Sequence, residues 1–118
     1  MEYNSIFELD DVLNDLHIDH IFRPMFDGFQ IIVESNKYRV SFIEHMGSYG
    51  SSNDLIEAWD AFGDPVGHLD VFACLEYLSE RRLLRRNWNE NVWRISRRKW
   101  EVKKQTSTIR KAESGSIC

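Results

Sequence analysis

A β-hairpin between residues 29 and 44 constrains the fold of this chain more than any other segment. Residues 29–34 are mostly apolar and β-branched, and residues 38–44 alternate with a period of two, which is typical of a strand with one buried face. Asn36, between the two runs, tolerates the positive φ of a tight turn. The segment therefore predicts an antiparallel hairpin. A Gly/Ser-rich loop is expected next, over residues 47–52, with Tyr49 as its only large side chain.

A helix is predicted ahead of the hairpin, from Ile6 to His17. Ser5 and Glu8 have the spacing of a capping box, in which each side chain bonds the backbone amide of the other residue. Apolar residues then recur at helical spacing, with acidic residues mostly on the opposite side. Residues 21–22 can form a short first strand, which Pro24 would confine to an edge of the sheet.

Three further signals complete the predicted fold. Asp27 and Gly28 indicate a turn into the hairpin. Residues 55–60 fit a short helix or a strand, and we expect a strand that joins the sheet. Asp70 is expected to cap a second long helix, in which Cys74 is a buried free thiol. This order predicts an α+β fold with a helix, a three- to four-stranded antiparallel meander sheet and a helix, followed by a basic Trp/Arg-rich C-terminal extension.

The net charge of −4 hides a division of charge along the chain. Residues 1–80 contain sixteen acidic and three basic residues, a net charge of −13, whereas residues 81–118 contain twelve basic and three acidic residues, a net charge of +9. We therefore expect an acidic α+β domain over residues 1–86 and a basic extension over residues 87–118. The acidic domain would attract basic surfaces and repel polyanions, and the extension would do the opposite.

The C-terminal extension interleaves aromatic and basic residues between residues 92 and 104. The two tryptophans at 93 and 100 share a face if the segment is helical, although a strand also fits. Such a composition suits nucleic-acid binding by phosphate neutralisation and base stacking. Alternatively, the tryptophans complete the core on the sheet while the arginines pair with the acidic domain. The candidate binding residues of the extension are Trp93, Arg94, Arg97, Arg98, Trp100 and Lys103.

No sequence pattern indicates catalysis. His17 and His20 lie near a helix end and His45 lies on another element, but no cysteine pair completes a zinc-ligand set, so solvated loop histidines are expected. Ser48 and Ser51 lie beside glycines without the Gly-x-Ser-x-Gly pattern of a nucleophile elbow. We therefore expect no enzyme activity, no cofactor and no metal.

Three segments follow one another along the chain in an order that resembles a known group of proteins. Residues 41–50 run from a hairpin strand into a Ser-Tyr-Gly loop, residues 55–60 are acidic and apolar, and residues 67–70 lead to a helix cap. This order resembles that of small uncharacterised bacteriophage and prophage proteins, although the Trp/Arg extension is not part of the resemblance. The resemblance implies a phage or mobile-element origin and a strand at residues 55–60, and it implies no catalytic residue.

These observations predict a non-enzymatic, phage-type binding protein that blocks or recruits a macromolecular partner. Small acidic phage proteins often occupy a basic site on a host defence protein, as many anti-CRISPR proteins do, so the expected mechanism is electrostatic mimicry of nucleic acid. Tyr49 either contacts the partner or folds back onto the sheet. The candidate partner-binding residues are Asp10, Asp11, Asp15, Tyr49, Glu57 and Asp60.

Two alternatives stay open. The extension can bind nucleic acid, or it can contact the acidic domain of a second copy and form a homo-oligomer. The expected partner is a host defence or nucleic-acid-handling protein. Without an apolar run of transmembrane length, a signal-peptide pattern or a disulfide framework, the chain is expected to be cytoplasmic in a bacterial host and to have no membrane partner.

Overall fold

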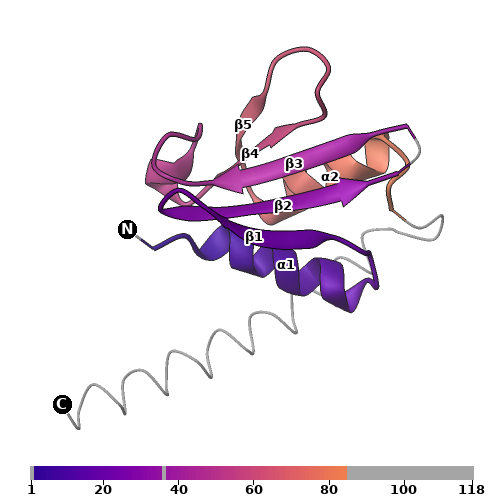
Figure 1. Cartoon of the computed structure of the whole chain (residues 1–118), viewed down its shortest axis with the longest axis horizontal. Helices are drawn as coiled ribbons and strands as arrows, with labels where there is room; N and C mark the ends of the chain where they lie inside the picture. Colours follow the sequence, from indigo (N-terminus) through magenta and orange to yellow (C-terminus); the bar gives the residue numbers. More distant parts are fainter. Residues whose placement is uncertain (1, 36, 85–118) are drawn as a thin grey trace, which may run out of the picture. The chain divides into compact units, whose positions relative to one another are not determined.

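The computed structural model describes residues 2–35 and 37–84. The helices are α1 (Asn4–Asp15) and α2 (Val71–Glu80), and a short 3-10 helix, η1, spans Ser51–Asn53. The strands are β1 (Ile21–Met25), β2 (Gly28–Glu34), β3 (Arg39–Glu44), β4 (Ile56–Trp59) and β5 (Val66–Leu69). They form one antiparallel meander sheet in the order β1-β2-β3-β4-β5, and both helices cover the same face of it (Figure 1).

Alternation along the strands decides which side chains form the core. In β3, Val40, Phe42 and Glu44 are fully buried. Phe42 is paired in register with Ile31 of β2 and Ala58 of β4, which are also fully buried. Helix α1 packs against β2 and β3, α2 packs against β4 and β5, and the two helices contact each other. The core is therefore one apolar layer between the sheet and the helices.

Most of the predicted elements are present. Strands β2 and β3 confirm the hairpin, and β4 confirms the strand interpretation of residues 55–60. Pro24 lies in β1, at the edge of the sheet. Asp70 caps α2, because its carboxylate accepts a hydrogen bond from the Ala73 amide at 2.8 Å, and Cys74 is a buried free thiol.

The predicted number of strands was too small. The sheet has five strands because residues 66–69 form β5, which carries no clear strand pattern. Gly67 lies within it, and His68 has a φ of 58°, which is unusual for a strand residue. The pairing of β5 with β4 also shifts between Ile56 and Ala58. A short, irregular strand of this kind does not produce the alternation on which the prediction depended.

The predicted start of the first helix was also wrong. Helix α1 begins at Asn4, and its N-cap residue, Tyr3, makes no side-chain capping bond. Ser5 therefore lies inside the helix and does not form the predicted capping box. Within the described part of the chain, neither helix is long and apolar enough to cross a membrane. The predictions for the extension, residues 87–118, lie outside the described residues.

Candidate partner-binding surface

Two neighbouring loops at one end of the sheet expose apolar side chains. The first is the β1–β2 turn, and the second follows β3 and begins with His45. The Asp27 carboxylate joins them, since it accepts a hydrogen bond from the Met46 amide at 2.8 Å and another from the Tyr3 hydroxyl at the start of α1. We call this surface, formed by Phe26, His45 and Met46, the loop-end surface.

The hydrogen bonds of Asp27 make the base of the loop-end surface well defined. The bond from Tyr3 is the largest cause that lowers the pKa of Asp27 below its usual value, and the Met46 amide lowers it further. The same bond to Asp27 raises the pKa of Tyr3 to about 12. Both groups are therefore in their bonded protonation states at neutral pH, with an ionised carboxylate and a protonated phenol.

Phe26 is the most unusual residue of the loop-end surface. Its side chain is 86% exposed, and its φ is 54°, in the left-handed region that a bulky residue rarely adopts. Among the described aromatic pairs, its ring meets only the His45 ring, in a T-shaped arrangement with a centroid distance of 5.1 Å. A glycine or asparagine would suit this turn better, so the position is not explained by the stability of the turn.

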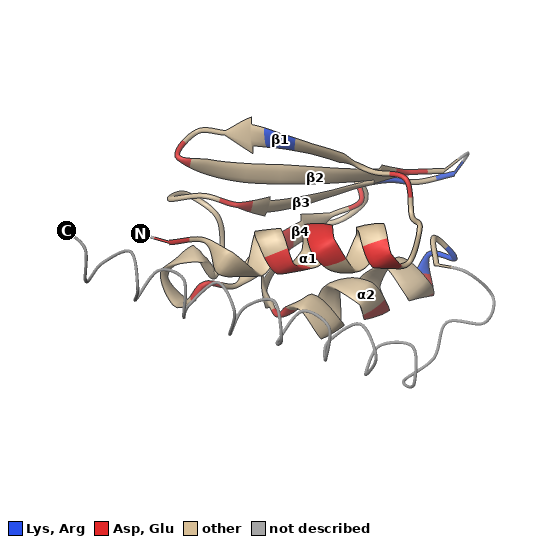
Figure 2. Ribbon diagram, turned by 90° about the horizontal axis from the view of Figure 1, so that it is seen from below, with Lys and Arg blue, Asp and Glu red and all other residues tan. Residues whose placement is uncertain are grey.

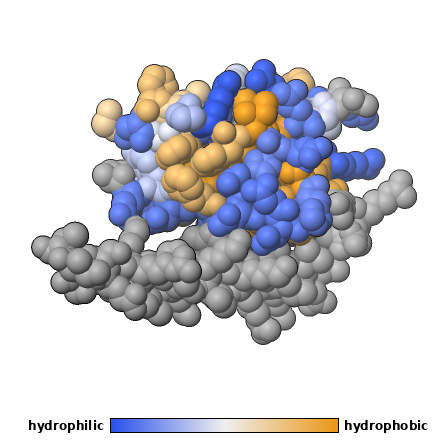
Figure 3. All heavy atoms as spheres, turned by 60° about the horizontal axis from the view of Figure 1, so that its bottom comes forward, coloured by the Kyte–Doolittle hydropathy of each residue, from blue (hydrophilic) through white to orange (hydrophobic). Residues whose placement is uncertain are grey.

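Met46 extends the apolar area beside Phe26 and is 77% exposed. Exposure alone does not identify a binding residue, as Phe7 shows. Phe7 is 44% exposed, but its ring packs against Phe22 and Phe29 at centroid distances of 5.4 and 4.7 Å. On the face drawn in Figure 3, apolar patches lie between hydrophilic residues. The loop-end surface differs because Phe26 and Met46 point away from the core.

Tyr49 lies further along the same loop, where its backbone is fixed on both sides. Its amide donates to the Glu57 carboxylate at 3.1 Å, and its carbonyl accepts from the His68 amide at 3.1 Å. A Cβ atom at Gly67 would come within 2.3 Å of the Tyr49 Cβ, so the close approach to β5 requires glycine at that position. The Tyr49 residue remains 62% exposed, which leaves its ring accessible to a partner.

Two carboxyl groups meet the N-terminus of α1 from distant parts of the chain. Asp54 accepts from the amides of Asn4 and Ser5 at 2.8 and 3.0 Å. Glu44, which is fully buried, accepts from the amide of Ile6 at 3.1 Å, while its Oε2 atom has no hydrogen-bond partner among the described residues. Burial, and next the neighbouring Asp54 carboxyl, raise the pKa of Glu44 to about 8. A protonated Glu44 keeps the buried site neutral.

Three of the six predicted partner-binding residues, Asp10, Asp11 and Asp15, lie on helix α1. Neither α1 nor α2 contains Lys or Arg, and Figure 2 shows acidic positions along both helices. Asp10 is bonded to His20, whose Nε2 atom lies 2.6 Å from the Asp10 Oδ1 atom. Asp11 and Asp15 are partly exposed. These three residues form an acidic helical surface that is separate from Tyr49 and Glu57.

Asp60 is placed differently from the other predicted partner-binding residues. It is only 7% exposed, and its carboxylate accepts from the Arg81 Nε atom at 2.7 Å. Arg81 lowers the pKa of Asp60 against the opposing effect of burial. The structure therefore uses Asp60 to hold the end of α2. The six predicted residues do not form one surface, and the six candidates of the extension lie outside the described residues.

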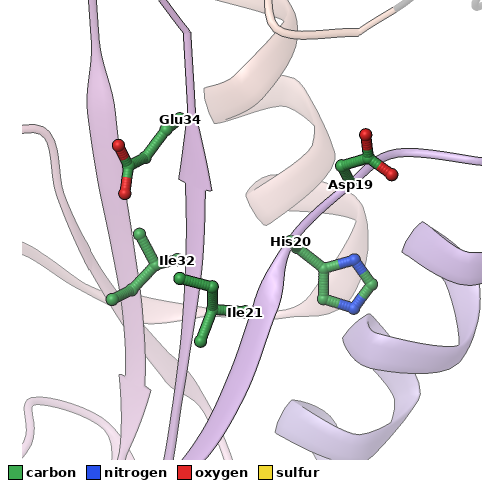
Figure 4. Close-up of a pocket in the computed structure, with 5 residues that line it drawn as sticks. All are labelled: Asp19, His20, Ile21, Ile32 and Glu34. Atoms are coloured by element: carbon green, nitrogen blue, oxygen red, sulfur yellow. The ribbon is translucent and has the colours of Figure 1, made fainter.

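A hollow of about 290 Å³ at the β1 edge is lined by one histidine and two acidic residues. Its lining residues are Asp19, His20, Ile21, Ile32 and Glu34 (Figure 4). The His20 ring points toward α1, where it bonds Asp10, and Asp19 and Glu34 lie apart from each other. Across residues 2–35 and 37–84, no three His, Cys, Asp or Glu side chains lie close enough to hold a metal ion.

Phe26 and Met46 were missed by sequence reasoning. An aromatic residue before Asp-Gly in a predicted turn was the available signal, because a turn position rarely needs a large apolar side chain. Comparison of the chain with protein-family models, with curated proteins and with solved structures finds no match.

Proposed function

We propose that this chain is a non-enzymatic binding protein that contacts a macromolecular partner through the loop-end surface. The observation that carries the proposal is the exposure of Phe26. Its side chain is 86% exposed, and its backbone has a φ of 54°. The turn gains little packing from this side chain, which meets the His45 ring and is otherwise exposed, and it bears an unfavourable backbone conformation. An apolar pocket on a partner would supply the missing contacts, and aromatic anchors of this kind dominate the energy of many interfaces.

The charge of the domain indicates the sign of the partner surface. Residues 1–84 contain sixteen acidic and five basic residues, a net charge of −11. Several of these acids are bonded internally, but the helical surface with Asp11 and Asp15 remains partly exposed. The negative electrostatic potential of the domain speeds association with a basic surface and opposes binding to nucleic acid. The expected partner is a protein with an apolar pocket on a basic surface.

One form of this function is inhibition of a bacterial defence protein. Proteins that bind nucleic acid present basic surfaces, and an acidic protein can occupy such a surface in place of the nucleic acid. The acidic helices would provide the electrostatic attraction, and Phe26 with Met46 would provide a short-range anchor. This division of roles predicts that salt weakens association while the apolar contact mainly determines how slowly the complex dissociates.

A pull-down from a bacterial lysate tests the proposal with matched variants. The immobilised chain is expected to retain a partner that the double variant Phe26→Ala/Met46→Ala loses, while Phe62→Ala still retains it. Phe62 is a suitable control because it is also well exposed, at 65%, and contacts Tyr38 at the other end of the sheet. Retention of the same partner by the double variant would exclude the loop-end surface as the anchor.

A second assay separates the proposal from nucleic-acid binding by the extension. The purified chain is mixed with DNA or RNA at low salt, with and without residues 87–118. We expect neither the full chain, with its net charge of −4, nor the truncated chain to retard nucleic acid. If the full chain retards nucleic acid and the truncated chain does not, the extension is the functional part and the proposal is wrong.

A further inference from the structure

An open pocket of about 560 Å³ lies at the end of the sheet opposite the loop-end surface. It is lined by the β2–β3 turn and by the C-terminal end of α2, two segments far apart in the sequence. Its lining residues are Ser35, Lys37, Tyr38, Glu80, Arg81 and Arg82. Three of the five Lys and Arg residues in residues 1–84 therefore line one pocket of an otherwise acidic domain.

Hydrogen bonds fix both walls of the pocket. In the turn, the Ser35 hydroxyl oxygen accepts from the amides of Lys37 and Tyr38 at 3.3 and 3.2 Å. At the end of α2, the Arg81 guanidinium donates to Asp60 at 2.7 Å and lies 3.4 Å from the centre of the Tyr77 ring. These contacts hold the backbone of the turn and the Arg81 side chain in place before any ligand binds.

The basic residues of the domain differ in whether they have partners. Arg23 donates to Gln30 at 2.7 Å, Arg39 pairs with Glu34 at 3.5 Å, and Arg81 pairs with Asp60. Lys37 and Arg82 make no ion pair with any residue in 2–35 or 37–84. These two uncompensated cations line the same pocket, so its unsatisfied charge is positive.

The acidic groups near the pocket do not cancel this charge. Asp60 is already paired with Arg81, and the carboxylate of Glu80 lies 3.6 Å from the same guanidinium with 73% of its side chain exposed. The Ser35 hydroxyl can still donate a hydrogen bond, because its described contacts use it as an acceptor. Lys37, Arg82 and Ser35 together offer the donors that a phosphate group requires.

An aromatic wall adjoins the charged pocket. A second hollow of about 300 Å³ shares Lys37 and Tyr38 with it and is also lined by Asp60 and Phe62. The Tyr38 and Phe62 rings meet edge to face, with centroids 6.2 Å apart. A partly exposed aromatic ring such as Tyr38 beside cationic side chains suits a ligand that has a planar ring next to a phosphate.

We propose that this pocket binds a nucleoside monophosphate, with the phosphate between Lys37 and Arg82 and the base against Tyr38. The proposal is independent of the function assigned to the loop-end surface, because the two lie at opposite ends of the sheet and share no residue. The Arg81 guanidinium donates to the Asp60 carboxylate and to the Tyr77 carbonyl, so it forms a wall of the pocket.

Titration of the full-length chain with AMP, followed by calorimetry at low salt, tests the proposal. We expect saturable binding that Lys37→Ala and Arg82→Ala each weaken about tenfold, since each removes one charge-assisted contact. Arg39→Ala is the matched control because it removes a nearby cation that does not line the pocket, and it should leave the affinity within about twofold of the parent value. Circular dichroism of each variant verifies that it is folded.

Two further probes separate the parts of the ligand. Inorganic phosphate and adenosine, titrated alone, should each bind more weakly than AMP. Equal binding of inorganic phosphate and AMP would overturn the role of Tyr38. Absence of saturable AMP binding up to about 10 mM would overturn the site itself, and so would an affinity of Lys37→Ala and Arg82→Ala equal to that of the parent.

Discussion

The two helices of this domain begin in different ways. Helix α2 is capped by the residue directly before it, since Asp70 accepts from the Ala73 amide. Helix α1 is capped from far along the chain, by Asp54 on the amides of Asn4 and Ser5. Both caps satisfy amides that a helix leaves unpaired at its first turn. The local cap stabilises one helix, whereas the distant cap also joins the start of the chain to the loop before β4.

The distant cap has a second component that the local cap lacks. Glu44 binds the Ile6 amide from within the core, next to the Asp54 carboxyl. Tyr3 bonds Asp27 on the β1–β2 turn, which in turn holds Met46. The N-terminus of α1 is thus connected to the base of the loop-end surface. A change there should affect both stability and the placement of Phe26, whereas a change at Asp70 should affect stability alone.

The largest expected effect in this comparison is the pH dependence of the free energy of unfolding that results from Glu44 at the start of α1. The pKa of Glu44 is raised from 4.5 to about 8 in the folded state. Its contribution to stability is therefore complete below pH 4.5 and is lost as pH rises through the folded pKa. The free energy of unfolding should fall by on the order of 3 kcal/mol across this window. Chemical denaturation at pH 5 and at pH 9 measures the difference.

Glu44→Gln should remove most of this decline, because a neutral amide replaces the buried acid. Glu76→Gln, on the exposed face of α2, is the matched control and should leave the pH dependence of the parent unchanged. The groups that face Glu44 are Asp54, Tyr3 and Cys74. A decline of the same size in Glu44→Gln would show that another group causes it.

Loss of the distant cap should have the next largest effect. Asp54→Ala removes the acceptor of two amides and is expected to lower the free energy of unfolding by about 2 kcal/mol. It should also change the environment of Met46, because α1 and the loop-end surface are connected through Tyr3 and Asp27. Denaturation measures the stability, and amide chemical shifts report on Met46. An unchanged Met46 signal would contradict the connection.

Loss of the local cap should cost less. Asp70→Ala is expected to lower the free energy of unfolding by about 1 kcal/mol, the usual value for one capping residue. Its effect should be confined to α2 and its neighbours, with no change at Phe26 or Met46. Hydrogen exchange of individual amides distinguishes this outcome from a general loosening. A cost equal to that of Asp54→Ala would remove the difference between the two helix starts.

The same contrast explains how much of the fold and of the surface could be predicted from the sequence. Asp70 was identified because it directly precedes the helix that it caps. Asp54 was not identified as a cap, because its partners lie about fifty residues earlier. Ser5 had the right spacing for a capping box, but the tertiary contact with Asp54 replaced the local one. Local patterns found the strands and helices, while the residues that connect them depended on contacts that no local pattern contains.

The loop-end surface shows the same limit. Asp27 and Gly28 indicated a turn here, but the turn residues are Phe26 and Asp27, and Gly28 begins β2. The exposure of Phe26 became visible only once the register placed it beyond the last pair of β1 and β2. Asp60, in contrast, was predicted to bind a partner and instead holds Arg81. The sequence indicates the acidic character of the domain. It does not indicate which carboxylates are bonded internally, because their basic or amide partners come from other elements.

The smallest expected effect comes from the coupling between Ser5 and Asp54. The Ser5 hydroxyl donates to the Asp54 backbone carbonyl, while the Asp54 carboxylate accepts from the Ser5 amide. Since the two contacts hold the same pair of segments together, the double variant Ser5→Ala/Asp54→Ala should be more stable than the sum of the single changes predicts, by about 0.5 kcal/mol. The pair Asp54→Ala/Asp70→Ala should be additive within error, because the two caps share no partner. Denaturation of the six proteins, the parent included, provides both cycles. Additivity in the first cycle would mean that the two contacts form independently, and that the distant cap is no more cooperative than the local one.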